Sequence, residues 1–261
     1  MGNTWRTVAS LIGAALVMPG HVPAQKPKPV STTWRTPWSY DGARGPEQWG
    51  DLDPLYAPCK AGREQSPIDI RSTEKADLPA LRFDYHNGPL NVINNGYTAV
   101  RVDYVESGDF LNVGGQRYQL TQFHFHRPSE ESVHGHLSDM VLHLMHAASD
   151  GRVAGVAVLL KAGHANPTIQ TLWRYMPKAE GPLEEIAGVE IDPGTLLPGD
   201  TAYYTYMGSQ TAPPCTEGVT WFVLKTQVDI SPEQINAFAT LYPHDVRPIQ
   251  PLNGRVVKEG R

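Results

Sequence analysis

The 261-residue chain lacks several features that mark particular classes of protein. It has no run of basic residues, and its formal net charge of −5 gives no reason to expect nucleic acid as a partner. Beyond the first 24 residues, no apolar segment is long enough to cross a bilayer. Residues 38–261 show no internal repeat and no break in composition, and helical patterns are few. These absences favour a single globular domain with little helix.

The first 24 residues have the composition of an export signal. Arg6 precedes an apolar stretch at residues 8–18, and small residues ending at Ala24 suit a cleavage site. We predict a signal peptide over 1–24, a flexible linker over 25–37, and export to the periplasm. An uncleaved anchor and full secretion are the alternatives. No membrane contact is expected after cleavage.

Cysteine is scarce, with Cys59 and Cys215 the two in the chain. An even number of cysteines suits a protein exported to an oxidising compartment. We predict that the two form one disulfide, and two unrelated buried thiols are the alternative.

Short β-forming runs recur, separated by glycine, asparagine, aspartate and proline. They predict strands at residues 90–93, 98–104, 118–126, 140–146, 153–160 and 219–228. Helices are predicted at 166–175 and at 231–242, the second opened by Ser231 and Pro232. The expected fold is therefore a sheet-dominated α+β domain spanning 38–261.

Histidines stand out within two of the predicted strands. His124 and His126 alternate with phenylalanines, so both histidines point to one face of their strand. His143 lies in the next apolar run. Three imidazole nitrogens with a fourth position open describe a catalytic zinc site, whereas a structural site uses four protein ligands. A histidine pair two residues apart also occurs by chance, so this pattern alone does not decide whether the histidines bind a metal.

Further motifs reduce that ambiguity through their order and spacing. They are residues 38–40 (WSY), 45–49 (GPEQW), 65–70 (QSPIDI), 94–96 (NNG), 122–126 (QFHFH), 206–215 (YMGSQTAPPC), 219–221 (VTW) and 247–253 (RPIQPLN). Together they resemble the α-class carbonic anhydrases, in particular the exported bacterial type, over residues 38–261. The resemblance implies a large central, mostly antiparallel twisted sheet of about ten strands with short peripheral helices. It also implies a disulfide between Cys59 and Cys215.

The resemblance implies an activity and a Zn²⁺ cofactor as well. The enzyme would hydrate CO₂ reversibly to bicarbonate and a proton, by attack of zinc-bound hydroxide. The metal ligands would be His124, His126 and His143. Thr211 would direct the hydroxide's hydrogen bond, with Glu130 as the acceptor that fixes the direction of the Thr211 hydroxyl.

Gln122 lies two residues before His124 on the same face of the strand, so it can accept a hydrogen bond from that imidazole and fix its tautomer.

Two positions near the expected site differ from the usual family sequence. Val141 replaces the glutamate that normally holds the third histidine, so we expect weaker zinc binding and an altered His143. Asp139, on the same strand face, is expected to lie too far away to substitute fully. Tyr97 replaces the usual proton-shuttle histidine, and a phenol generally keeps its proton up to about pH 10. We therefore expect turnover to depend on external buffer.

The apolar substrate pocket is altered too. Its expected residues are Met145, Gly155, Gln210, Ala212 and Trp221. Gln210 replaces a leucine, Ala212 a threonine, and Gly155 a valine of the pocket floor. The missing side chain at Gly155 suggests a wider pocket.

These differences support two alternative functions. One is a catalytically feeble, carbonic-anhydrase-like binding domain, and the other is an esterase that uses the same zinc-bound hydroxide in a wider pocket. The leading prediction remains CO₂ hydration, at a rate reduced by the changes at Tyr97, Val141 and Gln210. The expected partner is the small molecule CO₂ or bicarbonate, and the protein is expected to be a monomer or a homodimer.

Overall fold

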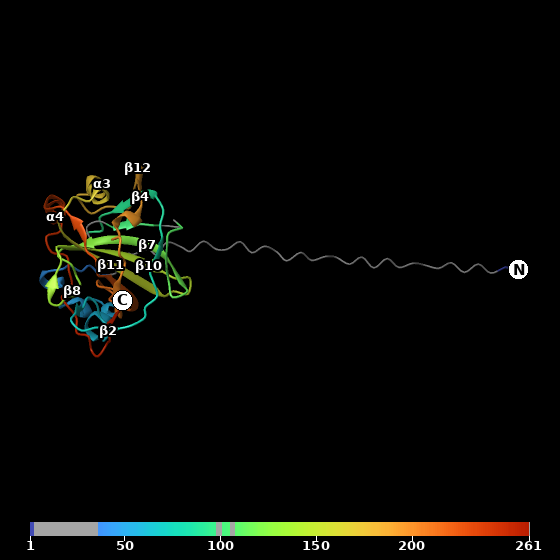
Figure 1. Cartoon of the computed structure of the whole chain (residues 1–261), viewed down its shortest axis with the longest axis horizontal. Coiled ribbons are helices and arrows are strands. Elements are labelled where there is room, and N and C mark those ends of the chain that lie inside the picture. Colours follow the sequence, from blue (N-terminus) through green and yellow to red (C-terminus); the bar gives the residue numbers. More distant parts are fainter. Residues whose placement is uncertain (3–35, 98–100, 105–107, 261) are drawn as a thin grey trace. The chain divides into compact units, whose positions relative to one another are not determined.

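The computed structural model describes residues 1–2, 36–97, 101–104 and 108–260 (Figure 1). The predicted signal peptide and almost all of the predicted linker lie outside the described residues. The main folded unit spans Arg35–Arg261. Among the described residues, no helix is both long and apolar enough to span a membrane.

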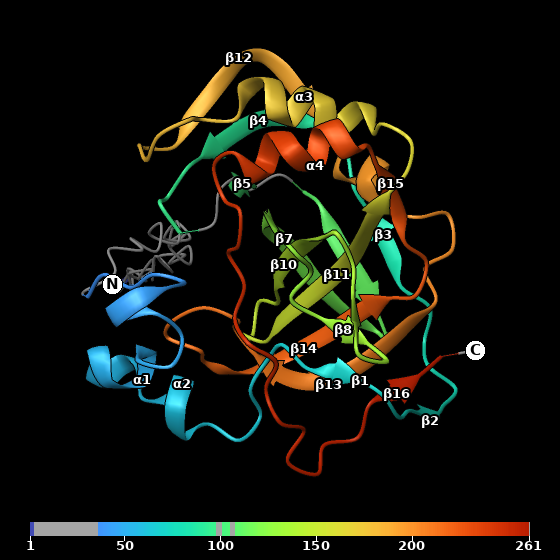
Figure 2. The ribbon, with the colours of Figure 1, turned by 90° about the vertical axis from the view of Figure 1, so that its left-hand side faces the viewer.

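A single large sheet dominates this unit, which confirms the predicted fold class (Figure 2). Its described strands number thirteen, of which ten form one continuous path. In spatial order these are β12 (Glu184–Ile191), β4 (Gly88–Ile93), β5 (Arg101–Asp103), β7 (Gln116–His126), β10 (Met140–Ala147), β11 (Val153–Ala162), β14 (Glu217–Leu224), β13 (Tyr203–Ser209), β16 (Lys258–Glu259) and β2 (Glu74–Lys75).

Shorter strands complete the architecture. β3 (Arg82–Asp84), β6 (Phe110–Val113) and β15 (Val228–Ile230) pair with the large sheet away from that path. A separate small sheet contains β1 (Asp69–Ile70), β8 (Ser132–Val133) and β9 (His136–Leu137). Most pairings are antiparallel, whereas β11 pairs in parallel with β14 and β15, β16 with β2, and β1 with β8. Ile70 of β1 and Val133 of β8 pack in the same apolar cluster as Val141 of β10, so the small sheet lies beside a histidine-bearing strand.

The centre of the sheet is buried on both faces. Phe123 and Phe125 of β7 and Leu142 of β10 enter the larger apolar cluster. Val141 of β10 points the other way, into a second cluster with Ile68 of the segment that leads into the small sheet. The alternation of side chains along each strand thus places the histidines on the face that carries the second cluster.

Two helices cover the opposite face of the sheet. α3 (Pro167–Tyr175) begins after the cap residue Asn166, and α4 (Pro232–Ala239) begins after a capping box that Ser231 forms with Gln234. The Trp173 indole of α3 donates a 2.8 Å hydrogen bond to the Gln234 backbone oxygen of α4. The shorter described helices are η1 (Gly42–Arg44), α1 (Trp49–Leu52), η2 (Pro54–Tyr56), α2 (Pro58–Ala61) and η3 (Pro193–Leu196).

The structure differs from the predicted elements in several places, and among them the second helix ends at Ala239 and several short strands were not predicted. The run at 219–228 is two strands, because β14 ends at Leu224 and β15 begins at Val228. The strands β12 and β13 were not predicted. β12 is largely exposed at the sheet edge and contains a register shift, so its sequence does not alternate between apolar and polar residues. Residues 98–100 of the predicted strand 98–104 lie outside the described residues.

The disulfide between Cys59 and Cys215 is present, as predicted. Both cysteines are buried in a third apolar cluster with Trp38, Trp49 and Tyr56. The bridge therefore ties α2 to the loop that follows β13.

Replacing both cysteines with serine is expected to lower the free energy of unfolding by about 3–5 kcal/mol, because the bridge closes a loop across 156 residues and limits the unfolded chain. Urea denaturation of the double variant and of the wild type, each with and without reductant, measures the effect. Equal midpoints for oxidised and fully reduced wild type would contradict this expectation.

Candidate metal centre

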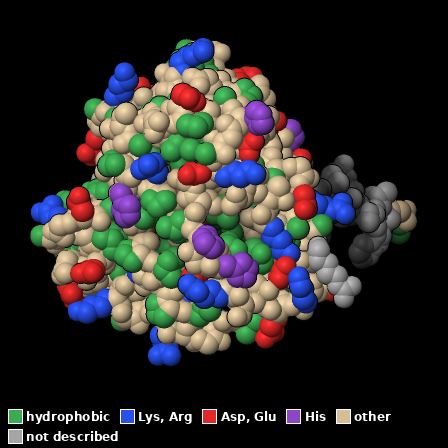
Figure 3. Space-filling model, turned by 60° about the vertical axis from the view of Figure 1, so that its left-hand side comes forward, with side chains coloured by type: hydrophobic (Ala, Val, Ile, Leu, Met, Phe, Trp, Pro, Cys, Tyr) green, Lys and Arg blue, Asp and Glu red, His purple; other side chains and the backbone are tan. Residues whose placement is uncertain are grey.

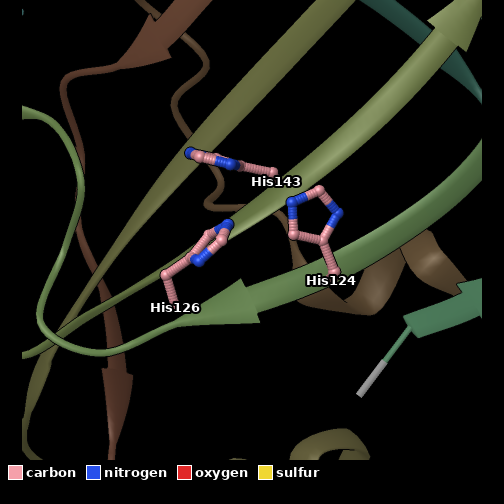
Figure 4. A group of neighbouring side chains, drawn as sticks. All are labelled: His124, His126 and His143. Carbon is pink, nitrogen blue, oxygen red and sulfur yellow. The ribbon is translucent and has the colours of Figure 1, made fainter. Parts of the chain in front are cut away.

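Neighbouring strands bring the three predicted histidines together (Figure 4). His124 and His126 lie on β7, and His143 on β10 is directly opposite His124 in the antiparallel register. Directly opposite residues point to the same face of a sheet. One potential ligand nitrogen from each ring lies within 4.8 Å of the others.

Each imidazole uses one nitrogen for a hydrogen bond that fixes its orientation. His124 Nδ1 lies 2.8 Å from Gln122 Oε1, which confirms the predicted contact. His126 Nδ1 lies 2.7 Å from the backbone oxygen of Asp245. His143 Nε2 lies 3.0 and 3.1 Å from the carboxylate oxygens of Glu131. All these oxygens accept hydrogen bonds, so each ring donates at that nitrogen and its other nitrogen presents a lone pair.

The remaining nitrogens fit a metal ion. Within the described part of the chain, His126 Nε2 and His143 Nδ1 are buried without any hydrogen-bond partner. Buried polar atoms without partners are costly, and a metal ion would satisfy both. Three imidazole nitrogens on one face, with a fourth position left to solvent or substrate, match the donor set of catalytic zinc.

The electrostatics of the rings differ. Burial lowers the pKa of His124 well below its usual value, and the neighbouring His126 and His143 add to this, so the neutral form of the ring is favoured. Burial also acts to lower the pKa of His126, but the carboxylates of Glu130 and Asp245 outweigh burial and raise it to about 9. A metal ion therefore competes with a proton for His126 Nε2.

The expectation that His143 lacks a carboxylate partner is wrong. Val141 is fully buried among apolar side chains, yet Glu131 supplies the acceptor from the segment between β7 and β8. Asp139 does not take this role, because its carboxylate accepts from the Ala162 backbone N–H. Sequence reasoning missed Glu131 because nothing in the local pattern distinguishes it from an exposed acidic residue.

Glu130 and Thr211 are both buried, but they do not hydrogen-bond to each other. Glu130 Oε1 accepts a 2.9 Å hydrogen bond from the Arg247 backbone N–H. Its Oε2 has no hydrogen-bond partner in the described structure and lies 3.5 Å from His126 Nε2 and 3.8 Å from His143 Nδ1. One carboxylate oxygen is thus fixed by the backbone, and the other faces the histidine nitrogens.

The comparisons with known proteins agree with this geometry. The family model for eukaryotic-type carbonic anhydrase matches residues 44–261. The chain belongs to the eukaryotic-type carbonic anhydrase family.

Individual relatives place it among the α-class enzymes. It is 42% identical to a carbonic anhydrase of Nostoc sp., over 85% of each chain. The solved α-carbonic anhydrase of Thermovibrio ammonificans, in complex with the inhibitor sulfanilamide, has a TM-score of 0.82 at 41% identity and covers 86% of this chain and 99% of its own. Dioscorin complexed with ascorbate has a TM-score of 0.79 at 34% identity, with the same coverage. The chain is therefore an enzyme of the carbonic anhydrase class, with hydration of CO₂ as its supported reaction.

The space beside Gly155, where a wider carbonic anhydrase pocket was expected, is occupied by Trp221. Gly155 lies opposite Met145 on one side and Trp221 on the other. A Cβ atom at Gly155 would lie only 2.7–2.9 Å from three atoms of the Trp221 ring. The indole thus fills the volume that a larger residue would take. Trp221 also packs against His143, with ring centroids 4.8 Å apart.

The remaining predicted residues lie around the loop after β13 and the aromatic cluster. Gln210 is exposed, whereas Ala212 is half-buried beside the cluster that contains the disulfide. Tyr97 stacks on Trp38, with ring centroids 4.4 Å apart and planes inclined by 22°. Tyr97 is therefore part of a packed aromatic group.

Sequence reasoning also missed an ion pair on the face that bears the histidines. Arg101 of β5 is directly opposite His124, and Asp103 is opposite Gln122. The Arg101 guanidinium donates to both Asp103 oxygens at 2.6 and 2.8 Å. The alternation of Arg101 and Asp103 in the predicted strand was the available indication. On the face of the molecule drawn in Figure 3, acidic and basic side chains are interspersed.

Changing Gly155 to alanine is expected to lower the free energy of unfolding by about 1–3 kcal/mol, because the new methyl group overlaps Trp221. Gly199→Ala is the matched control, since a Cβ atom there meets nothing within 4 Å. Urea denaturation followed by tryptophan fluorescence measures both variants. Equal stability of the two would mean that the space beside Trp221 is open after all.

Proposed function

We propose that this enzyme hydrates CO₂ to bicarbonate with one Zn²⁺ ion held by His124, His126 and His143. The three convergent imidazoles, each fixed by an acceptor at its other nitrogen, carry this proposal. When bound, zinc lowers the pKa of a coordinated water so that a nucleophile is present near neutral pH.

The protein's own groups hold the ligands ready for the metal. Gln122, the Asp245 backbone oxygen and Glu131 each keep one ring nitrogen protonated. The rings consequently cannot rotate or change tautomer without leaving a buried acceptor unpaired. Such hydrogen bonds to metal ligands typically change affinity or activity by about 10–100-fold.

Glu130 and Thr211 are proposed to orient the nucleophile. The partnerless Oε2 of Glu130 can accept the Thr211 hydroxyl proton, while Oε1 stays fixed by the Arg247 N–H. The hydroxyl oxygen of Thr211 would then be free to accept a hydrogen bond from the group that occupies the open side of the three histidines.

The substrate is proposed to lie against apolar side chains beside the histidines. Trp221 packs on His143, and Met145 lies two residue pairs along the ladder that β10 forms with β7. Ala212 follows Thr211, and the exposed Gln210 adds a polar group near this loop. An apolar wall suits CO₂, which has no net charge. The product bicarbonate is an anion, which such a wall does not favour.

Export to an oxidising compartment, the periplasm, is proposed as the location. The disulfide between Cys59 and Cys215 supports it, because such bridges persist in oxidising surroundings. The signal peptide at 1–24, with the linker at 25–37, remains a prediction, as does a monomeric or homodimeric state.

The observations behind the alternative functions weaken in the structure. The esterase alternative depended on extra space at Gly155, which Trp221 fills. The binding-domain alternative depended partly on Val141, and Glu131 supplies the missing partner of His143. Gln210 and Tyr97 remain as changes that bear on rate.

Mature protein is expected to contain one zinc ion per chain and to hydrate CO₂ well above the buffer blank, because the ligand set is complete. Zinc analysis and stopped-flow CO₂ hydration on the same sample test this. His126→Ala should lose both properties, whereas His136→Ala, an exposed histidine on β9, should keep both. Full zinc content without hydration would sink the proposed activity and favour the binding domain.

Replacing Tyr97 with histidine is expected to raise kcat by at least about tenfold in dilute buffer, because an imidazole exchanges protons near neutral pH and a phenol does not. The difference should shrink as buffer concentration rises. Tyr97→Phe keeps a ring for stacking on Trp38 and controls for disturbance of that contact. No gain in the histidine variant would mean that protons leave by another route.

A further inference from the structure

Glu131 is a completely buried carboxylate that hydrogen-bonds to the side chain of His143. Its side chain has no solvent exposure, and both oxygens face His143 Nε2 at 3.0 and 3.1 Å. Burial acts to raise the pKa of Glu131, but its proximity to His143 outweighs burial and lowers it. The pair is thus a charge-assisted contact in a dry interior.

The backbone around Glu131 is held on both sides. Ser129 Oγ donates a 2.7 Å hydrogen bond to the Glu131 backbone oxygen, and it accepts one of 2.8 Å from the Ser138 N–H. Ser132 then pairs with Asp69 in the small sheet, and its N–H donates to the Ile68 oxygen. These contacts fix where the carboxylate enters the site.

Val141 occupies the strand position from which a carboxylate would otherwise reach His143. It lies two residues before His143 on the same face of β10 and is fully buried. Its neighbours in the second apolar cluster include Ile68, Ile70 and Trp221. A second carboxylate here would be buried beside Glu131 with no donor of its own, which is costly. The interior therefore has room for one carboxylate at His143, from the loop or from the strand.

We propose that Glu131 is the positioning residue for His143, and that positions 131 and 141 are interchangeable sources of one carboxylate. The inference rests on the proposed zinc site. Glu131 touches neither substrate nor metal: it keeps the proton on His143 Nε2, so that Nδ1 presents its lone pair to the site.

Two measurements test this role, and the first needs no metal. Imidazole ¹H–¹⁵N spectra of zinc-free, ¹⁵N-histidine-labelled protein report the tautomer of His143, with His143→Gln used for assignment. The wild type is expected to show the Nε2–H tautomer, and Glu131→Ala to lose that preference. Glu131→Gln keeps an oxygen acceptor and should retain the tautomer in part.

The second measurement is the rate of zinc release to an excess of chelator. Glu131→Ala is expected to release zinc about 10–100-fold faster than wild type, with Glu131→Gln between them. Asp139→Asn is the matched control, because Asp139 is also acidic and adjoins β10, but its carboxylate accepts from the Ala162 N–H instead of facing His143. It should release zinc at the wild-type rate.

A swap separates positioning from mere packing. The double variant Glu131→Ala/Val141→Glu returns a carboxylate from the strand and should recover most of the slow release and the Nε2–H tautomer. Val141→Glu alone should lower thermal stability. If Glu131→Ala does not fold, Glu131→Gln and the double variant still provide the comparison.

The outcomes separate the two proposals. Wild-type tautomer and release rate in Glu131→Ala, or no recovery in a folded double variant, would overturn the role of Glu131 and leave the zinc enzyme standing. Wild-type protein that binds no zinc would overturn the proposed function, and the tautomer in the zinc-free protein would still decide what Glu131 does.

Discussion

The cost of burying polar groups is the constraint on which this site depends. The three imidazoles lie on one face of two strands whose other side chains are largely apolar. Each ring therefore needs a hydrogen-bond acceptor for its N–H group. Those acceptors come from three separate segments: Gln122 on the same strand, Glu131 in the following loop, and the Asp245 backbone far along the chain. The nitrogens left without partners are the ones that converge, and the same desolvation that makes them costly makes them good ligands.

Much of the fold could be predicted from local sequence, because the central strands bury alternating or continuous apolar residues. The strands β7, β10 and β11, and the capped helices α3 and α4, follow from periodicity and from cap residues. β12 could not be predicted this way, since a largely exposed edge strand with a register shift leaves no regular alternation of buried and exposed residues. The large, mostly antiparallel central sheet was implied by the family resemblance.

The residues of the site also differ in how well the sequence predicts their positions. The histidines and Gln122 share one strand face or face each other across one ladder, so sequence periodicity locates them. Glu131 and Trp221 act through contacts between segments, and their residue types alone do not reveal those contacts. Each occupies a place that a difference from the family sequence would leave unfilled. Glu131 bonds His143 where Val141 cannot, and Trp221 fills the space beside Gly155. A substitution that looks like a loss in an alignment can thus be matched by a neighbour in space.

The positions of the three histidines along the chain affect how the enzyme folds. The three histidines and Glu131 all lie between residues 124 and 143, on two adjacent strands and the segment joining them. Bringing them together closes only short loops, so its entropic cost is small. Asp245 and the partner of Cys59 must instead arrive from the far end of the polypeptide. We expect the cradle for the ion to form early during folding and the enclosing walls to close around it later.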